Sequence, residues 1–146
     1  MVDTLQVTDA DYRVLHEFRY QIRRYFHGTE AAARAEGLEP QQHQTLLAIR
    51  AMEKSGPTVG KLAEQLMVRH HSVVGLIDRL SERGLVERVR GGEGDRRRVR
   101  VRLTGAGEEK LERLSSVYRA ELEGSGPLLV YALWALLRRV AERGSG

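Results

Sequence analysis

The chain carries its densest charge between Arg88 and Arg102. This stretch holds seven arginines and two acids, so its net charge is +5 (seven minus two), whereas the whole chain of 146 residues carries only +4. Arginine presents a planar set of donors that suits phosphate oxygens, and a cluster of one sign marks an electrostatic contact surface. An arginine run can also be an ordinary solvated face. The elements around this run favour the contact surface.

Two strand patterns carry these arginines. In the segments LVERVR and RRVRVRL, apolar residues alternate with arginine, which is the two-residue period of a half-buried strand. The apolar residues are Val89, Val99, Val101 and Leu103, and the arginines are Arg88, Arg90, Arg98, Arg100 and Arg102. The segment GGEGDR between them contains three glycines, which supply the positive φ angles of a turn. We therefore predict an antiparallel β-wing.

Two short helical patterns precede the wing. Thr58 is the expected N-cap of the first, in which apolar residues recur at helical spacing. The second has apolar residues at i, i+3, i+4 and i+7 and ends at Gly84. The apolar positions are Leu62, Ala63 and Leu66 in the first helix, and Val73, Leu76, Ile77 and Leu80 in the second. This order predicts a helix-turn-helix followed by a wing, a device for holding DNA.

The second of these helices has a polar face opposite its apolar one. That face carries donors of the kind that meet phosphates and base edges in a major groove. They are Arg69, His70, His71, Ser72 and Arg79. We interpret this helix as the recognition helix.

Helical patterns also lie on the N-terminal side of this region. Thr8 and Asp11 predict the start of a helix that keeps its apolar spacing to about His27, and residues 31–37 either continue it or fray. A second helix is expected from about Pro40 to Lys54, because proline is tolerated in a first helical turn.

The C-terminal side is expected to hold two helices. Thr104 can cap one that runs to about Glu123, and the Gly-Ser-Gly-Pro segment at 124–127 predicts a clean break before the last helix. The last helix is apolar on more than one face, so we expect a partner chain to cover it.

Length and composition limit the class of protein. The expected fold is mainly α with a small two- or three-stranded antiparallel β-wing, in a single domain over residues 1–146. Its DNA-binding region is expected at 40–104 and its dimerisation helices at 8–36 and 105–143. The chain has no cysteine, which excludes disulfides and thiol-based redox sensing. We expect a cytoplasmic protein with no membrane partner, since neither a secretory signal nor a membrane-length apolar run is found.

The run from residue 58 to residue 104 resembles the winged-helix core of the MarR (multiple antibiotic resistance regulator) family. That family has an LAE-type first helix, DRL late in the recognition helix, G-L-V entering the wing, and D-x-R followed by L-T. The matching segments are Leu62-Ala63-Glu64, Asp78-Arg79-Leu80, Gly84-Leu85-Val86, Asp95-Arg96-Arg97 and Leu103-Thr104. Two positions depart from the family's pattern: Arg69 replaces a small hydroxyl residue, and Gly75 replaces a basic one.

The resemblance implies a transcriptional regulator, usually a repressor, that dimerises through its N- and C-terminal helices. Two recognition helices related by a twofold axis would enter successive major grooves about 34 Å apart and read an inverted repeat. We expect His70, His71 and Ser72 at base edges, and Arg69 and Arg79 at bases or phosphates.

Other contacts are expected on the phosphate backbone and in the minor groove. Thr58 and Lys61, at the start of the preceding helix, are placed for phosphates. By the family's pattern Arg97 is the arginine that enters the minor groove, and Asp95 orients it. Arg96 and Arg98 would add phosphate contacts.

The resemblance also implies a small aromatic anion that binds between the dimerisation helices and the winged region and releases the DNA. Candidate residues combine apolar walls with cationic groups. They are Phe18, Arg19, Arg23, His43 and Trp134. The alternative is a DNA-binding regulator or architectural protein without a small-molecule sensor.

Catalysis and metal sensing find little support in the sequence. No nucleophile–histidine arrangement, phosphate-binding glycine motif or paired carboxylates stand out, so we predict no enzyme and no cofactor. The five histidines leave a metal-responsive regulator as a further alternative. However, cysteine is absent, and the adjacent His70 and His71 point apart on a helix, so no metal site is expected.

Overall fold

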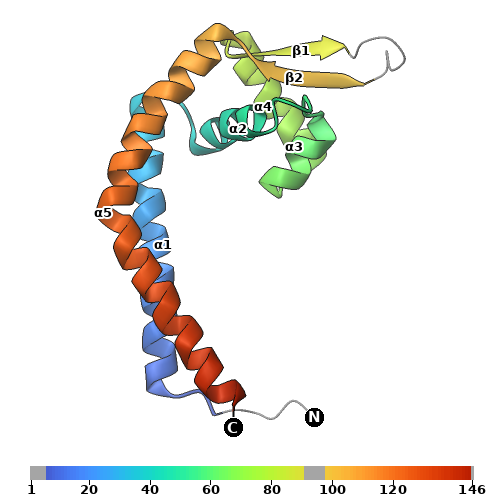
Figure 1. The fold of residues 1–146 in the computed structure, drawn as a ribbon. Helices are drawn as coiled ribbons and strands as arrows, with labels where there is room; N and C mark the ends of the chain where they lie inside the picture. Colours follow the sequence, from blue (N-terminus) through green and yellow to red (C-terminus); the bar gives the residue numbers. More distant parts are fainter. Residues whose placement is uncertain (1–5, 91–97, 146) are drawn as a thin grey trace. The chain divides into compact units, whose positions relative to one another are not determined.

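The computed structural model describes residues 6–90 and 98–145. In chain order the elements are α1 (Asp9–Ala35), α2 (Pro40–Ala51), α3 (Val59–Leu66), α4 (His70–Glu82), β1 (Val86–Arg90), β2 (Val99–Leu103) and α5 (Gly105–Gly144) (Figure 1). The predicted class, mainly α with a small antiparallel wing, is confirmed. Contacts divide the chain into two compact units, one of Met1–Ala31 with Val117–Gly146 and one of Ala32–Ser116. The single domain over 1–146 stays a prediction.

The second unit is a winged helix built around an apolar core. Each of its helices and strands contributes inward side chains, and burying one of this size stabilises the fold by about 1.5–3 kcal/mol. The apolar residues at most 2% exposed in this unit are Ala33, Leu38, Leu46, Ile49, Leu62, Val73, Ile77, Leu80, Val86, Val101 and Leu114. The buried stripe predicted for α4 is therefore confirmed, and it fixes which face of that helix points outward.

The helix boundaries in this unit follow local signals. The Thr58 hydroxyl accepts a hydrogen bond from the amide of Lys61 at 3.2 Å and caps α3 as predicted. Gly84 adopts a φ of +70° at the end of α4, which confirms its predicted role. Helix α2 is shorter than predicted: it ends at Ala51, and a turn leads to Gly56 at φ +64°.

The two strands pair antiparallel with Val86 opposite Leu103 and Val89 opposite Arg100. Residues directly opposite each other share a face of the sheet, so valine and arginine occur together on both faces. Val101 is fully buried, whereas Val99 at the outer end is 36% exposed. A bridge between Thr58 and Arg100 attaches the segment before α3 to the other edge of β2.

Helix α1 starts and ends at residues with clear local roles. The amide of Thr8 donates to the Asp11 carboxylate at 2.7 Å, and the Thr8 hydroxyl donates to it at 2.8 Å. The helix then continues to Ala35, so residues 31–35 do not fray, and Gly37 with a φ of +75° follows its end.

The break predicted at residues 124–127 is wrong, because α5 is one helix from Gly105 to Gly144 with Pro127 inside it. Proline removes one backbone donor, but its fixed φ is compatible with a helix. The buried Ser125 hydroxyl donates to the Glu121 carbonyl at 2.7 Å within the same turn. Contacts with α1 occur on both sides of the proline, since Gly28 faces Glu121 and Asp11 pairs with Arg139. Thr104 nevertheless caps α5 as predicted, accepting from the Gly107 amide at 3.1 Å.

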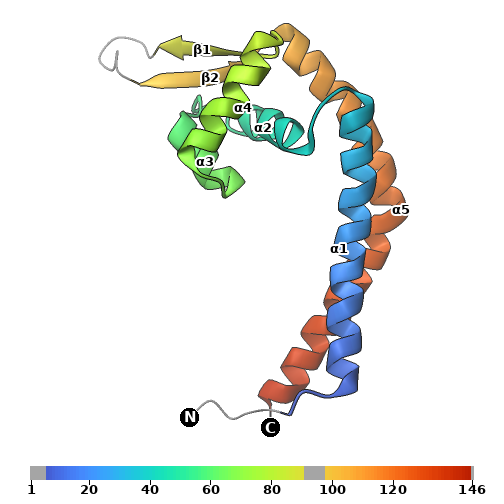
Figure 2. The same ribbon diagram turned by 180° about the vertical axis from the view of Figure 1, so that it is seen from behind.

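In the first unit, α1 and α5 lie side by side and antiparallel (Figure 2). Gly28 faces Glu121, whereas Asp11, at the opposite end of α1, pairs with Arg139 at 2.9 Å and with Arg143. Hydrogen bonds from the Thr8 amide and hydroxyl, then the two guanidinium groups, hold the pKa of Asp11 well below its usual range. This carboxylate therefore joins the cap of one helix to the end of the other.

The first turn of α5 is packed closely against Leu85, which lies between α4 and β1. A Cβ at Gly107 would lie 2.0 Å from the carbonyl oxygen of Leu85. That carbonyl already accepts from the Thr104 amide at 3.1 Å, so it has little freedom to move.

We therefore predict that Gly107→Ala lowers the free energy of unfolding by about 2 kcal/mol, as overpacking does elsewhere. Thermal or urea unfolding measures the effect. Gly105→Ala, in the same turn with nothing within 4 Å of its added Cβ, is the matched control. Equal stability of the two variants would contradict the packing described here.

Candidate nucleic-acid interface

The outer face of α4 is polar and accessible. His70 and His71 are exposed in its first turn, Ser72 is half-buried, and Arg79 is exposed two turns later. Arg69 is the N-cap residue, with extended backbone angles of −70° and 149°, and its side chain makes no capping hydrogen bond. All five predicted recognition residues therefore come from one short segment and lie away from the core.

The start of α3 presents a second set of predicted contacts. Thr58 is half-buried because its hydroxyl caps the helix, and Lys61 is exposed. The Lys61 ammonium pairs with Glu64 at 3.3 Å, and 52% of the lysine side chain remains accessible. Such an exposed pair contributes little stability, so Lys61 can exchange this partner for a phosphate at small cost.

Gly75 lies in the middle of the recognition helix without a packing requirement. It is half-buried, and a Cβ at this position would first meet the Arg79 guanidinium, whose Nη2 would be 3.4 Å away. The arginine side chain thus lies back along the helix over the glycine. The space that a side chain at position 75 would fill therefore lies on the outer surface of the helix and not in the core.

The wing strands use part of their charge internally. Arg88 of β1 pairs with Asp78 of α4 at 2.5 Å, and Arg102 of β2 pairs with the cross-strand Glu87 at 2.5 Å. The Asp78–Arg88 pair joins the recognition helix to the wing. The net charge of the arginine run therefore overstates the charge that the wing offers to a ligand.

Arg98 is exposed just before β2, at the outer end of the described wing. The other predicted wing residues, Asp95, Arg96 and Arg97, and the glycine turn lie outside the described residues.

Met67 is a candidate contact residue that our sequence analysis does not select. It follows α3 in the left-handed region at φ 55°, and its side chain is 93% exposed. A left-handed conformation is costly for a residue with a side chain, and such strain concentrates at functional sites. A methionine where the turn favours glycine is the signal that could have marked this position.

The predicted effector residues are distributed over both units. Phe18 is half-buried on α1, Arg19 and Arg23 are exposed on the same helix, and Trp134 on α5 is 52% exposed with the Arg138 guanidinium 5.4 Å from its ring centre. His43 belongs to the second unit and is buried, and burial lowers its pKa. The imidazole therefore favours its neutral form and is poorly suited to serve as a cation. A shared site for these residues stays a prediction.

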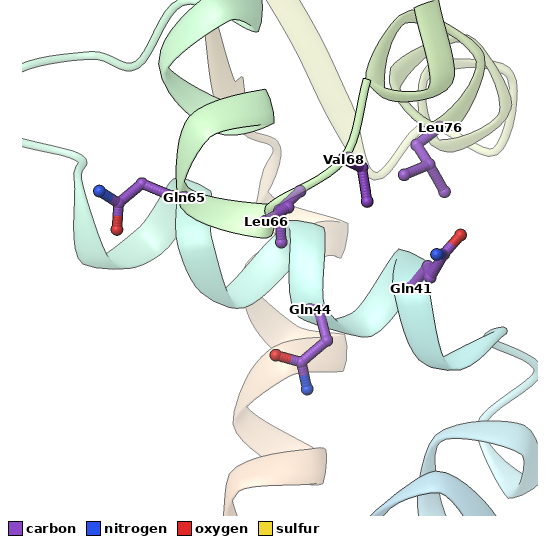
Figure 3. Close-up of a pocket in the computed structure, with 6 residues that line it drawn as sticks. All are labelled: Gln41, Gln44, Gln65, Leu66, Val68 and Leu76. Carbon is purple, nitrogen blue, oxygen red and sulfur yellow. The ribbon is translucent and has the colours of Figure 1, made fainter. Parts of the chain in front are cut away.

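A pocket of about 180 Å³ lies next to the recognition helix in the second unit (Figure 3). Its lining comes from α2, α3, the turn after α3, and α4: Gln41, Gln44, Gln65, Leu66, Val68 and Leu76. None of the predicted effector residues lines it. Its volume falls below the roughly 300 Å³ at which pockets commonly enclose small molecules.

Residues 6–90 and 98–145 contain no group of three or more histidine, aspartate or glutamate side chains able to hold a metal ion. Among the same residues, no helix combines the length and apolar character needed to cross a bilayer.

Comparison with known proteins identifies the winged segment. Residues 36–98 match the model of the MarR family, which confirms the resemblance carried by the sequence motifs. A search of curated protein sequences gives no match.

Solved structures with the same fold cover most of the chain. AbsC, a MarR family transcriptional regulator from Streptomyces coelicolor, has a TM-score of 0.75 at 22% identity and covers 98% of this chain and 99% of its own. MepR, a transcription regulator of the Staphylococcus aureus multidrug efflux pump MepA, has a TM-score of 0.71 at 19% identity, covering 86% and 94%. MepR in complex with DNA has a TM-score of 0.67 at 19% identity, covering 88% and 91%. At these identities the likeness establishes the fold.

The geometry around Gly75 leads to a prediction about stability. Gly75→Ala should raise the free energy of unfolding by about 1 kcal/mol, because alanine favours a helix interior and its Cβ meets only a movable side-chain end. Chemical unfolding measures this change, and Ser81→Ala, later in the same helix, controls for the general effect of alanine. A loss of stability would mean that the glycine has a packing role in the subunit.

Proposed function

Because residues 36–98 form a winged helix of the MarR family, we propose that this chain is a transcriptional regulator that binds double-stranded DNA sequence-specifically. The observation that carries this proposal is the division of α4 into two faces. Its buried stripe anchors the helix in the core, and its outer face presents Arg69, His70 and His71 to solvent. A helix held in this way can enter a major groove without disturbing the fold.

Each part of the surface has a proposed role in the complex. His70, His71 and Ser72 read base edges, while Arg69 and Arg79 contact bases or phosphates. Thr58 and Lys61 approach the phosphate backbone from the start of α3. The MepR–DNA complex supports this proposal, since it is a complex of a protein with the same fold.

The wing is proposed to reach the adjacent minor groove. Arg97 enters the groove, Asp95 orients it, and Arg96 and Arg98 add contacts to phosphates. If about 6 phosphates are neutralised, affinity should fall by roughly 10³ between 50 and 200 mM salt.

We propose that the protein acts as a homodimer on an inverted repeat. The first unit exposes many large apolar side chains, which a second copy would cover. On α5 these are Val117, Leu122, Leu128, Val130, Tyr131, Leu133, Trp134, Leu137 and Val140, and on α1 they are Tyr12, Leu15, Tyr20 and Phe26. The N- and C-terminal helices thus both supply the dimer surface.

In the cell we propose a repressor that a small aromatic or phenolic ligand releases from its operator. MepR has been solved with ethidium bromide bound, at a TM-score of 0.58 and 21% identity over 86% of this chain and 94% of its own. A relative with this fold therefore accepts a planar aromatic molecule. For this chain Phe18, Arg19, Arg23, His43 and Trp134 remain the proposed effector residues.

Two alternatives share the DNA-binding surface but not the sensor. One is a regulator or architectural protein without a small-molecule ligand, and the other is a metal-responsive regulator.

The proposed wing contact gives a test of DNA binding. Arg97→Ala should weaken binding to the operator by roughly tenfold or more at moderate salt, because one minor-groove arginine per subunit is lost. Fluorescence anisotropy on an operator recovered by selection from random duplexes measures the affinity. The melting temperature of the Arg97→Ala variant should match that of the wild type. Undiminished affinity of this variant would refute the wing assignment.

The proposed sensor gives a separate test. An aromatic acid present at 100 times its dissociation constant should stabilise the protein by about 2.7 kcal/mol, which appears as a higher melting temperature. A panel of aromatic acids and phenols is compared with aliphatic acids of the same charge. If no compound moves the melting temperature, the alternative without a sensor is favoured.

A further inference from the structure

Arg100, in β2, makes two hydrogen bonds to the backbone of its own chain. Its Nη1 donates to the carbonyl oxygen of Gly56 at 2.7 Å and also to that of Ser55. Both carbonyls belong to the turn between α2 and α3. Arg100 is half-buried, whereas Arg98, just before β2, and Arg102, within it, are exposed. Its guanidinium is thus directed at a backbone turn of the same subunit.

Gly56 shapes this turn so that the arginine side chain can pack on it. Its φ is +64°, and a Cβ at this position would lie only 3.0 Å from the Cδ of Arg100. The aliphatic part of Arg100 therefore lies against the glycine backbone while the guanidinium binds the two carbonyls. Next to this contact, the Val101 amide donates to the Pro57 carbonyl at 2.9 Å.

The turn leads directly into Thr58, the N-cap of α3, and Lys61 follows one turn later. Arg100 therefore ties strand β2 to the start of α3. The proposed function places phosphate contacts at the start of α3 and, through Arg98, just before β2. A duplex has fixed spacing between its phosphates, so the two protein surfaces must keep a fixed spacing as well.

We propose that Arg100 is a positioning residue for DNA binding, which fixes the wing against the start of α3 and contacts no phosphate itself. The proposal rests on the proposed function, because it assigns a role within the same DNA-binding surface. It divides two arginines of the wing by role: Arg98, just before β2, contacts DNA, whereas Arg100 within β2 fixes the geometry of the wing.

The salt dependence of binding separates these two roles. Arg98→Gln and Arg100→Gln each remove one positive charge per chain, so they are matched variants. Log affinity falls as log salt rises, and loss of one phosphate contact from each subunit of a dimer makes this negative slope shallower by about 2. We expect this change for Arg98→Gln. For Arg100→Gln we expect roughly tenfold weaker binding to the operator duplex with the wild-type slope.

Arg100→Lys tests the same idea while keeping the charge. Both bonds come from Nη1 of Arg100, and the lysine ammonium lies one bond closer to Cα than Nη1 does. Lysine should therefore not reach both carbonyls, so this variant should bind as weakly as Arg100→Gln. Full affinity in Arg100→Lys would overturn the proposal. Wild-type affinity in Arg100→Gln, or a slope reduced as in Arg98→Gln, would overturn it too.

Amide hydrogen exchange in the free protein tests, without DNA, whether the contact of Arg100 with the carbonyls of Ser55 and Gly56 holds β2 in place. The Val101 amide should exchange faster in Arg100→Lys and Arg100→Gln than in the wild type, because its bond to Pro57 is no longer reinforced. Arg98→Gln should leave this rate unchanged. Unchanged exchange in the Arg100 variants would overturn the proposal that Arg100 fixes the wing against the start of α3. Failure of the wild type to bind any duplex would instead overturn the proposed function.

Discussion

The winged unit depends on the burial of one stripe of α4. Val73, Ile77 and Leu80 are fully buried, and together they fix the rotation of the helix about its axis. That rotation decides which side chains reach solvent, so the polar face from Arg69 to Arg79 follows from apolar packing on the opposite side. Removing this burial would disorder the candidate interface even if each polar residue were kept. The functional surface is therefore a consequence of the core.

Charge in the wing is divided between internal and external tasks. Asp78 holds Arg88, Glu87 holds Arg102, and the carbonyls beside Gly56 hold Arg100. The exposed ion pairs of Arg88 and Arg102 contribute at most about 1 kcal/mol each, so they matter for orientation more than for stability. The three contacts together connect the wing to the recognition helix, to its own partner strand and to the start of α3. An arginine-rich hairpin is in this way a braced element as well as a charged one.

The first unit differs from the winged unit in its apolar surface, because its two helices leave much of that surface uncovered. The ion pairs of Asp11 with Arg139 and Arg143 set how α1 and α5 meet near one end. Beyond these contacts, Val130, Tyr131 and Val140 are all more than 60% exposed. Water disfavours such a surface, and a second copy of the chain is the occupant that the proposed function requires.

Sequence by itself determined the features that depend on local chemistry and periodicity. The cap at Thr58, the glycine end of α4, the buried stripe and the alternating strands could all be read from neighbouring residues, and so could the outward face of the recognition helix. Tertiary structure decided what depends on distant residues. Local propensity predicts a break at Pro127, yet α5 is continuous and contacts α1 on both sides of the proline, so one missing hydrogen bond does not end the helix. The pairing of Arg100 with the turn at Gly56 likewise joins residues far apart in the chain, and no local pattern distinguishes that arginine from Arg98.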